Sequence, residues 1–116
     1  MSDTITIWHN PRCSKSRETL KRIEAAGHAP VVRLYLADAP GADDIAAVQA
    51  MLGVPLVQMM RVKEAAFRDA GLSKDSAEAD LLAAMVAHPV LIERPVVIRG
   101  GRAVIGRPPE AVDALL

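Results

Sequence analysis

The stretch "TITIWHNPRCSKSRETL", residues 4–20, decides the fold, because a strand, a loop and the start of a helix follow one another in it. The β-branched residues at 4–8 predict the strand, and "NPRCS" predicts the loop. A helix is expected from about Ser14 to Ala26, with Gly27 just past its end. The junction of loop and helix holds the only cysteine of the chain, Cys13.

Later segments predict a second strand and several helices. "PVVRLYL" (30–36) predicts a strand, so that strand, helix and strand form a parallel right-handed βαβ unit. The middle of the chain is expected to be helical, in segments at 43–52, 55–61, 64–70 and 73–88. The last of these segments opens on residues of the cap type: Ser73, Asp75 or Ser76.

The C-terminal part predicts a hairpin and a final helix. "PVVIRGGRAVIG" (95–106) gives two short strands around Gly100 and Gly101, and "RPPEAVDALL" (107–116) places two prolines where a helix begins. This order fits an α/β fold with a small mixed four-stranded sheet, flanking helices and a helical insertion. It is the thioredoxin-like arrangement, and we expect one domain over residues 1–116.

Composition narrows the class of protein. Hydrophobic residues make up 51% of the 116 residues, enough for a buried core, and 14 Lys+Arg balance 14 Asp+Glu. This balance argues against binding to nucleic acid or to an anionic membrane surface. No signal peptide or membrane-spanning stretch is recognised, and one cysteine cannot form an internal disulfide. The expected location is the cytoplasm.

Cys13 is expected to be a nucleophile. The N-terminus of a helix favours an anion, and nearby cations lower the pKa of a thiol further. Arg12, Lys15, Arg17 and His9 are candidate cations, although Lys15 and Arg17 cannot both face the sulfur from one helix. A lone cysteine can also be a small buried hydrophobe. Its polar and basic neighbours favour the reactive thiolate.

Ser16 completes a C-x-x-S motif, in which a dithiol oxidoreductase has a second cysteine. A serine cannot resolve a mixed disulfide, so resolution must come from an external thiol. The Ser16 hydroxyl can hydrogen-bond a thiolate, or it can satisfy backbone N–H groups of the first helical turn. The two roles are compatible.

Spacing excludes three other kinds of site. A Cys-x5-Arg phosphate-binding loop needs arginine where the chain has Thr19. His9, His28 and His88 are too scattered to be metal ligands together, and no glycine-rich nucleotide loop is present. We therefore expect no metal and no bound cofactor.

Three arginines distant in sequence are candidate oxyanion ligands: Arg61, Arg94 and Arg107. An arginine fork donates two parallel charge-assisted hydrogen bonds to an oxyanion. Taken alone, each of them could equally be a surface arginine. In thioredoxin-like folds a cis-proline before the third strand faces the active-site cysteine, and Pro95 holds the matching position.

The segments "HNPRCSKSRETL", "LGV…MMRVKE", "HPVLIERPVV" and "GRPPE" resemble the glutaredoxin-coupled arsenate reductases of the ArsC type, and most of all their arsenate reductase-like housekeeping relatives. The resemblance runs over essentially the whole chain. It implies an oxidoreductase that reduces arsenate, or a similar oxyanion, to arsenite. Glutathione is the implied co-substrate and glutaredoxin the implied protein partner.

The resemblance also assigns roles to residues. Cys13 matches the nucleophile, and the oxyanion-binding arginines match Arg61, Arg94 and Arg107. His9 matches a histidine that helps keep the thiolate charged, and Ser16 matches a serine that supports it. The form "PRCSKS", with basic residues on both sides of the cysteine, departs from the operon-encoded reductases, which tend to have small residues there.

Two alternatives remain open at the level of sequence. Regulators of the Spx type share this fold and bind RNA polymerase, but they commonly carry C-x-x-C. A glutathione-linked thiol enzyme acting on another substrate would also use a lone reactive cysteine.

Overall fold

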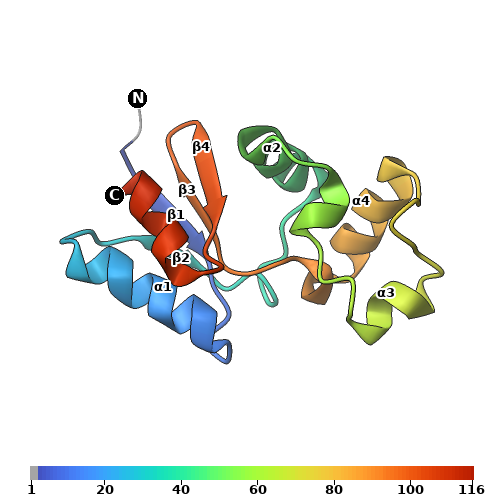
Figure 1. The fold of residues 1–116 in the computed structure, drawn as a ribbon, viewed down its shortest axis with the longest axis horizontal. Coiled ribbons are helices and arrows are strands. Elements are labelled where there is room, and N and C mark those ends of the chain that lie inside the picture. Colours follow the sequence, from blue (N-terminus) through green and yellow to red (C-terminus); the bar gives the residue numbers. More distant parts are fainter. Residues whose placement is uncertain (1–2) are drawn as a thin grey trace. The chain divides into compact units, whose positions relative to one another are not determined.

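The computed structural model describes residues 3–116, and its contacts divide the chain into two compact units. The first comprises the chain up to Asp38 together with Arg94–Leu116, and the second is Ala39–Glu93 (Figure 1). The first unit contains the sheet and the Cys13 loop, and the second is the expected helical insertion. The single domain over the whole chain stays a prediction.

The sheet has four strands in the order β2-β1-β3-β4. These are β1 (Ile5–Trp8), β2 (Val31–Arg33), β3 (Val96–Arg99) and β4 (Arg102–Ile105). β1 pairs in parallel with β2 and antiparallel with β3, and the β3–β4 hairpin is antiparallel. The small mixed four-stranded sheet expected from the sequence is confirmed.

β2 is shorter than the predicted strand at 30–36, because the chain turns after Arg33. The carbonyl of Leu34 accepts hydrogen bonds from the backbone N–H groups of Ala37 and Asp38, at 3.0 and 2.8 Å. This turn replaces ladder pairing at the edge of the sheet. It leaves two large apolar side chains half in solvent, Leu34 at 48% and Leu36 at 49% exposure.

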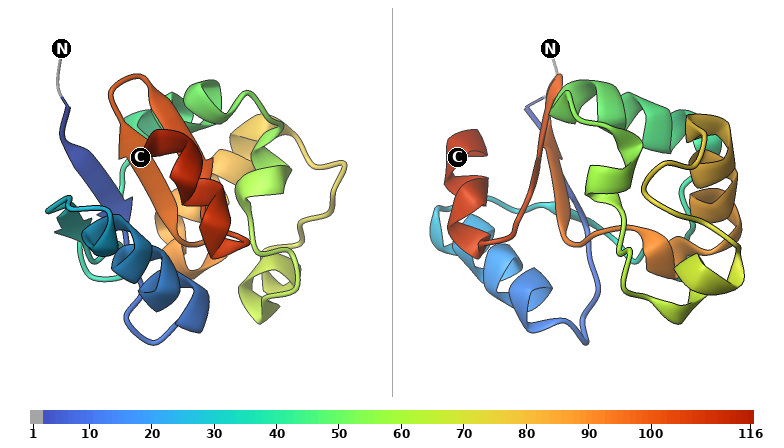
Figure 2. Two further views of the ribbon diagram at one scale, coloured as in Figure 1. Left: turned by 60° about the vertical axis from the view of Figure 1, so that its left-hand side comes forward. Right: turned by 45° about the vertical axis from the view of Figure 1, so that its right-hand side comes forward.

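One face of the sheet is covered by α1 (Ser14–Ala25) and by η3 (Pro109–Leu115), which lie side by side (Figure 2). η3 is the predicted C-terminal helix, and it is a 3₁₀ helix. Arg22 of α1 makes a bidentate salt bridge with Asp113 of η3. Between these layers lies the core of this unit, formed by Ile5, Ile7, Ile23, Val97, Val112 and Leu115.

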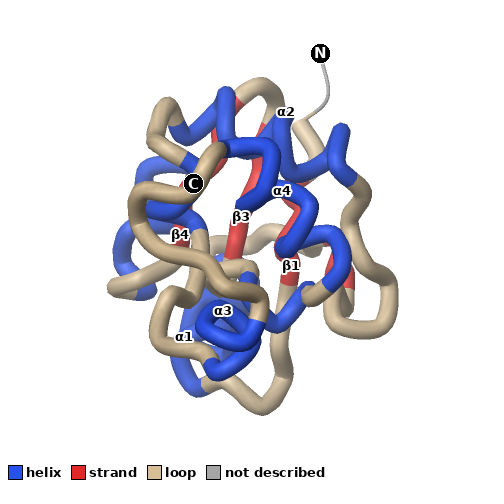
Figure 3. Tube along the Cα trace, turned by 90° about the vertical axis from the view of Figure 1, so that its right-hand side faces the viewer, coloured by secondary structure: helices blue, strands red, loops and turns tan. Residues whose placement is uncertain are grey.

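The insertion consists of helices joined by loops (Figure 3). Its longer helices are α2 (Ala42–Leu52) and α4 (Glu78–Ala87), which pack on each other. The shorter ones are η1 (Leu56–Met59), α3 (Ala65–Asp69) and η2 (Pro89–Leu91). Within residues 3–116, no helix is long and apolar enough to cross a bilayer.

The start predicted for the helix at 73–88 is wrong. α4 begins at Glu78 with Ala77 as its N-cap, not at Ser73, Asp75 or Ser76. The two serines instead form a turn of their own, since Ser73 N–H donates to Ser76 Oγ at 2.9 Å and Asp75 N–H to Ser73 Oγ at 3.2 Å. Serine and aspartate side chains stabilise such turns as readily as they cap helices.

Gly106 fixes how closely the hairpin approaches α1. A Cβ at this position would lie 2.6 Å from Thr19 Oγ1 and 2.9 Å from Pro95 Cγ. The Gly106 N–H donates to the Pro95 carbonyl at 2.9 Å, so the backbone cannot easily retreat. Only glycine fits between α1 and the segment that enters β3.

We predict that Gly106→Ala lowers the free energy of unfolding by about 1–3 kcal/mol, because the added methyl group overlaps two packed side chains. Gly101→Ala is the matched control, since a Cβ there meets no atom within 4 Å. Urea denaturation of both variants measures the difference. Equal stabilities would show that Gly106 is not a packing constraint.

Candidate active site

Cys13 is the N-cap of α1, with extended backbone at φ −95° and ψ 122°. Its N–H donates to the Asn10 carbonyl at 3.0 Å, and its own carbonyl accepts from Arg17 N–H at 3.0 Å. The loop is therefore closed by a hydrogen bond before the helix begins. The residue is 8% exposed, at the helix start that the sequence predicts.

The pKa of the Cys13 thiol is lowered from its ordinary value. Burial raises this pKa, but four interactions together lower it by more than burial raises it. They are the hydrogen bond from the Ser16 backbone N–H, the charge of Arg94, the hydrogen bond from the Lys15 backbone N–H and a hydrogen bond from the Arg94 side chain. Backbone N–H groups of a first helical turn have no partner within the helix, so they are available to an anion. The site thus favours a thiolate, the nucleophilic form of cysteine.

Arg94 reaches Cys13 because of the order of the strands. Arg94 directly precedes Pro95 and β3, and β3 pairs with β1 so that Val96 lies opposite Trp8. The end of β1 and the start of β3 are therefore neighbours. The Arg94–Pro95 peptide bond is cis, as the thioredoxin-like arrangement leads one to expect.

His9 and Ser16 form a buried pair next to the cysteine. His9 Nδ1 lies 2.7 Å from Ser16 Oγ, which also accepts a hydrogen bond from Asn10 N–H at 3.0 Å. Burial, and then the charge of Arg17, lower the pKa of His9 from its ordinary value. This direction disfavours the charged form of the imidazole. The role of His9 in tuning the thiol stays a prediction.

The partners of Ser16 distinguish its two suggested roles. Its hydroxyl is engaged by His9 and Asn10, whereas the group that bonds the thiol is its backbone N–H. The hydroxyl therefore fixes the loop that precedes Cys13. It holds the helix start in place for the sulfur.

The flanking cations act mainly elsewhere. Arg17 donates to the Pro11 carbonyl at 2.9 Å, and the side chains of Arg12 and Lys15 are exposed. Lys15 contributes to the thiol through its backbone N–H. The local positive charges that surround Cys13 in sequence are thus not its principal partners.

The three candidate oxyanion arginines have different surroundings. Arg94 lies beside Cys13. Arg107 is exposed and follows β4, with its N–H bonded to the Ile105 carbonyl at 2.8 Å. Arg61 belongs to the insertion, where it forms an ion pair with Glu64 at 2.6 Å. Their roles as substrate ligands stay predictions.

Asn10 is a site residue that the sequence interpretation missed. Its carbonyl binds Cys13 N–H, its N–H binds Ser16, and its Oδ1 accepts from Arg12 N–H at 3.0 Å. These contacts hold the loop between β1 and α1. The signal was present in the sequence, because Asn followed by Pro favours the start of a turn.

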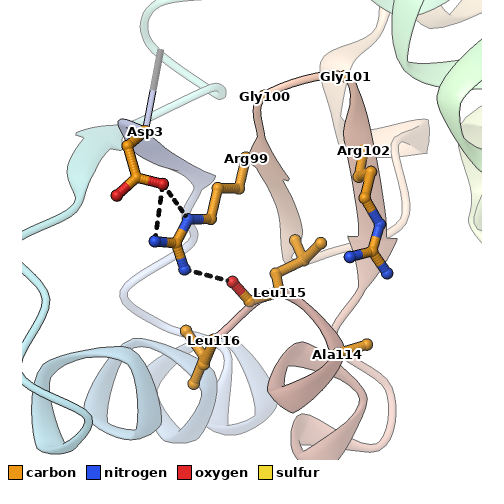
Figure 4. A pocket seen from close by; sticks show the side chains of 8 residues that line it. All are labelled: Asp3, Arg99, Gly100, Gly101, Arg102, Ala114, Leu115 and Leu116. Atoms are coloured by element: carbon orange, nitrogen blue, oxygen red, sulfur yellow. Dashed lines mark hydrogen bonds and ion pairs between the residues drawn. The ribbon is translucent and has the colours of Figure 1, made fainter. Parts of the chain in front are cut away.

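Among the described residues of the first unit, two of the hollows lie at different ends of the sheet. One, of about 220 Å³, borders the cysteine loop and is lined by residues 9–12 with Leu34, Leu36 and Ala37. The other, of about 420 Å³, lies at the β3–β4 turn, where Arg99 pairs with Ile5 at the start of β1 (Figure 4).

The arginine in the larger of these two hollows, Arg99, has a structural role. Arg99 binds Asp3 through two nitrogens, at 2.9 and 2.8 Å, and donates to the Leu115 carbonyl at 2.6 Å (Figure 4). Its charge and donors thus join the chain before β1 to the end of η3. No group of three or more potential metal ligands occurs among the residues described.

The fold and the site define a class: a thioredoxin-like protein with one free cysteine at the N-cap of its first helix. The sequence profile of the ArsC family matches residues 8–115. An arsenate reductase of Haemophilus influenzae is 43% identical over 97% of this chain and 99% of that protein. The YfgD protein of Escherichia coli K12 is 43% identical over 97% of this chain and 96% of that protein.

Solved structures agree with the sequence comparisons. An arsenate reductase from Vibrio cholerae superimposes with a TM-score of 0.94 at 42% identity, covering 100% of both chains. The chain belongs to the ArsC family. The family expected from the sequence motifs is therefore confirmed, and membership of the housekeeping branch stays a prediction.

We predict that the alkylation rate of Cys13 by iodoacetamide rises with pH at a midpoint below about 8.5, the value of an ordinary cysteine. Arg94→Gln removes a positive charge and a donor, so the midpoint should move to higher pH. Arg68→Gln, at an exposed position of the insertion, is the control and should leave the midpoint unchanged. A midpoint that is the same in all three proteins would contradict the assignment of Arg94.

We also predict that Ser16→Ala destabilises the protein by about 1–3 kcal/mol, because Nδ1 of His9 and the N–H of Asn10 lose a buried partner. The alkylation midpoint of Cys13 should hardly move, since the backbone N–H of residue 16 remains. Ser14→Ala, at the exposed start of the same helix, is the control. A large midpoint shift without loss of stability would instead assign the hydroxyl to the thiol.

Proposed function

We propose that this protein reduces arsenate to arsenite with Cys13 as nucleophile. The observation that carries the proposal is the lowered pKa of the Cys13 thiol, buried at a helix start with Arg94 beside it. A thiolate attacks arsenic, and a guanidinium stabilises the oxyanion as its charge develops. Membership of the ArsC family supports this choice of substrate.

The reaction proceeds in two steps that balance. The Cys13 thiolate forms an S–As bond while one arsenate oxygen takes up protons and leaves as water, and arsenic stays As(V). An external thiolate then attacks the Cys13 sulfur. The S–As bond breaks, its electron pair goes to arsenic, and arsenite leaves as As(III). The two sulfurs, each oxidised by one electron, form a mixed disulfide.

The proposed reductants are glutathione and glutaredoxin. The chain has one cysteine, and Ser16 occupies the position of a resolving thiol. Glutathione therefore supplies the second sulfur, and glutaredoxin takes over the glutathione moiety to free Cys13. Such a reaction needs a reducing compartment, and we propose that the protein works in the cytoplasm without a bound cofactor.

Arg94, Arg107 and Arg61 are the proposed oxyanion ligands. Arg94 is the best supported, since it donates to the sulfur that would hold the arsenic. Arg107 is exposed and follows β4. Arg61 would have to share its charge with Glu64. His9 is proposed to orient the loop through its contact with the Ser16 hydroxyl.

A second candidate is a glutathione-linked thiol enzyme that acts on another substrate. The exposed Arg12 and Lys15 beside the site favour this reading, because they add positive charge that binding of a small oxyanion at Cys13 does not require. A regulatory module of the Spx type is disfavoured, since Ser16 stands where those proteins commonly carry a cysteine.

We predict arsenate-dependent oxidation of NADPH when the protein is coupled to glutathione, glutaredoxin and glutathione reductase. Cys13→Ser should abolish turnover, because a serine hydroxyl at neutral pH is a far weaker nucleophile. Arg94→Ala should lower kcat/KM by roughly 100-fold, the usual loss for one oxyanion donor. Arg107→Ala and Arg61→Ala should each lower it to a smaller extent.

Arg68→Ala is the matched control and should keep full activity, because Arg68 is an exposed arginine of the insertion. Absence of turnover in the native protein, or equal turnover in Cys13→Ser, would refute the proposed function. A mixed disulfide that forms at Cys13 without any response to arsenate would favour the second candidate.

A further inference from the structure

The hollow beside the cysteine loop has an apolar wall that the proposed chemistry does not explain. Leu34 and Leu36 stand in it at 48% and 49% exposure, across from Pro11 and Arg12. Both leucines come from the turn that ends β2, which the Leu34 carbonyl holds in place. These exposed side chains form a fixed feature of the surface.

The hollow is continuous with the reactive loop. Asn10, one of its lining residues, accepts the hydrogen bond of Cys13 N–H, and Arg12 directly precedes the cysteine. A partner seated there has its edge within a few residues of the sulfur. A molecule that must exchange a disulfide with Cys13 needs such a position.

The apolar character of the hollow indicates the kind of partner. Glutathione is a small, strongly polar peptide with two carboxylates and gains little from two exposed leucines. Protein–protein interfaces, in contrast, combine an apolar centre with a charged rim. Here Leu34 and Leu36 would form the centre and Arg12 the rim, which calls for an acidic side chain on the partner.

We propose that this hollow, lined by residues 9–12, Leu34, Leu36 and Ala37, docks the thiol protein that releases Cys13 from its mixed disulfide, a protein of the glutaredoxin class with an acidic group facing Arg12. The inference rests on the proposed function for the identity of the reductant. It assigns to Arg12 a role outside oxyanion binding. It also explains why the turn after β2 exposes two leucines.

The step that follows docking is a thiol–disulfide exchange. A thiolate of the partner attacks the glutathione sulfur of the Cys13 mixed disulfide, forming a new S–S bond to glutathione. The old S–S bond breaks, and Cys13 leaves as a thiolate. A thiol with a lowered pKa is a good leaving group. The backbone N–H groups of Ser16 and Lys15 stabilise the negative charge of the departing thiolate by hydrogen bonding.

The experiment measures this exchange without arsenate. The protein is converted to its glutathione mixed disulfide at Cys13, and the rate of its reduction is followed against glutaredoxin concentration. The double variant Leu34→Ser/Leu36→Ser should raise the glutaredoxin concentration for half-maximal rate by roughly tenfold, because the leucines no longer bury apolar area. Arg12→Glu should raise it as well, and should reverse the salt dependence of the rate.

Two controls separate docking from access to the sulfur. Dithiothreitol is a small thiol that needs no docking surface, so its rate of reduction should be the same in every variant. Val86→Ser, an exposed apolar residue of α4 in the insertion, should leave the glutaredoxin reaction unchanged. Thermal unfolding verifies that each variant is folded.

The outcomes are distinct. An unchanged glutaredoxin dependence in the double variant would overturn the proposal. If the double variant slowed reduction by dithiothreitol as much as reduction by glutaredoxin, the proposal would also be overturned. The leucines would then affect the reactivity or accessibility of the sulfur rather than docking. Reduction of the mixed disulfide by glutathione alone can be measured in the same way. If the double variant slowed this reaction as much as the glutaredoxin reaction, the hollow would be assigned to the small thiol, which would likewise overturn the proposal. Failure of arsenate turnover in the native protein would refute the proposed function and leave this exchange measurable.

Discussion

The stabilisation of a negative charge on the Cys13 sulfur is the constraint that organises the rest of the site. Burial opposes this charge, and the structure offsets the cost with two backbone N–H groups and one guanidinium. These N–H groups are available to the sulfur because α1 begins at Ser14, so that they lie in its first turn. The start of the helix depends on a loop that the hydrogen bond from Cys13 N–H to the Asn10 carbonyl closes. The sheet, the loop and the helix therefore act together on a single atom.

The guanidinium depends on a different part of the fold. Arg94 reaches the sulfur because β3 lies beside β1. The segment before β3 is held by the hydrogen bond from Gly106 N–H to the Pro95 carbonyl, and Gly106 packs against Thr19 and Pro95. A residue of α1, a residue after β4 and the proline before β3 thus meet at one point. Packing around Gly106 therefore brings Arg94 beside the thiol although the two residues are far apart in sequence. A local sequence motif cannot predict this contact.

Much of this arrangement could be predicted from the sequence. The strand–loop–helix order around Cys13 and the hairpin at Gly100 and Gly101 follow from local patterns, and both are found. The start of α4 was misplaced, because Ser73 and Ser76 serve a turn as well as they would serve a cap. The nearest cations in sequence were overvalued, since Arg17 donates to the Pro11 carbonyl and burial lowers the pKa of His9. Side-chain direction and burial decide these points, and neither is written in a local motif.

A protein with one thiol can take part in only half of a disulfide cycle. In the proposed reaction Cys13 ends as a mixed disulfide, and the electrons that free it come from another molecule that reaches the same sulfur. The proposed oxyanion site is polar, with Arg94 at the thiol, while the proposed protein reductant needs a surface that holds it briefly. We assign that role to the exposed leucines after β2 and the exposed Arg12, which line the hollow next to the loop. The shortness of β2 is part of this arrangement, because the Leu34 carbonyl bonds Ala37 and Asp38 in a turn and the leucines on either side of Tyr35 stay exposed.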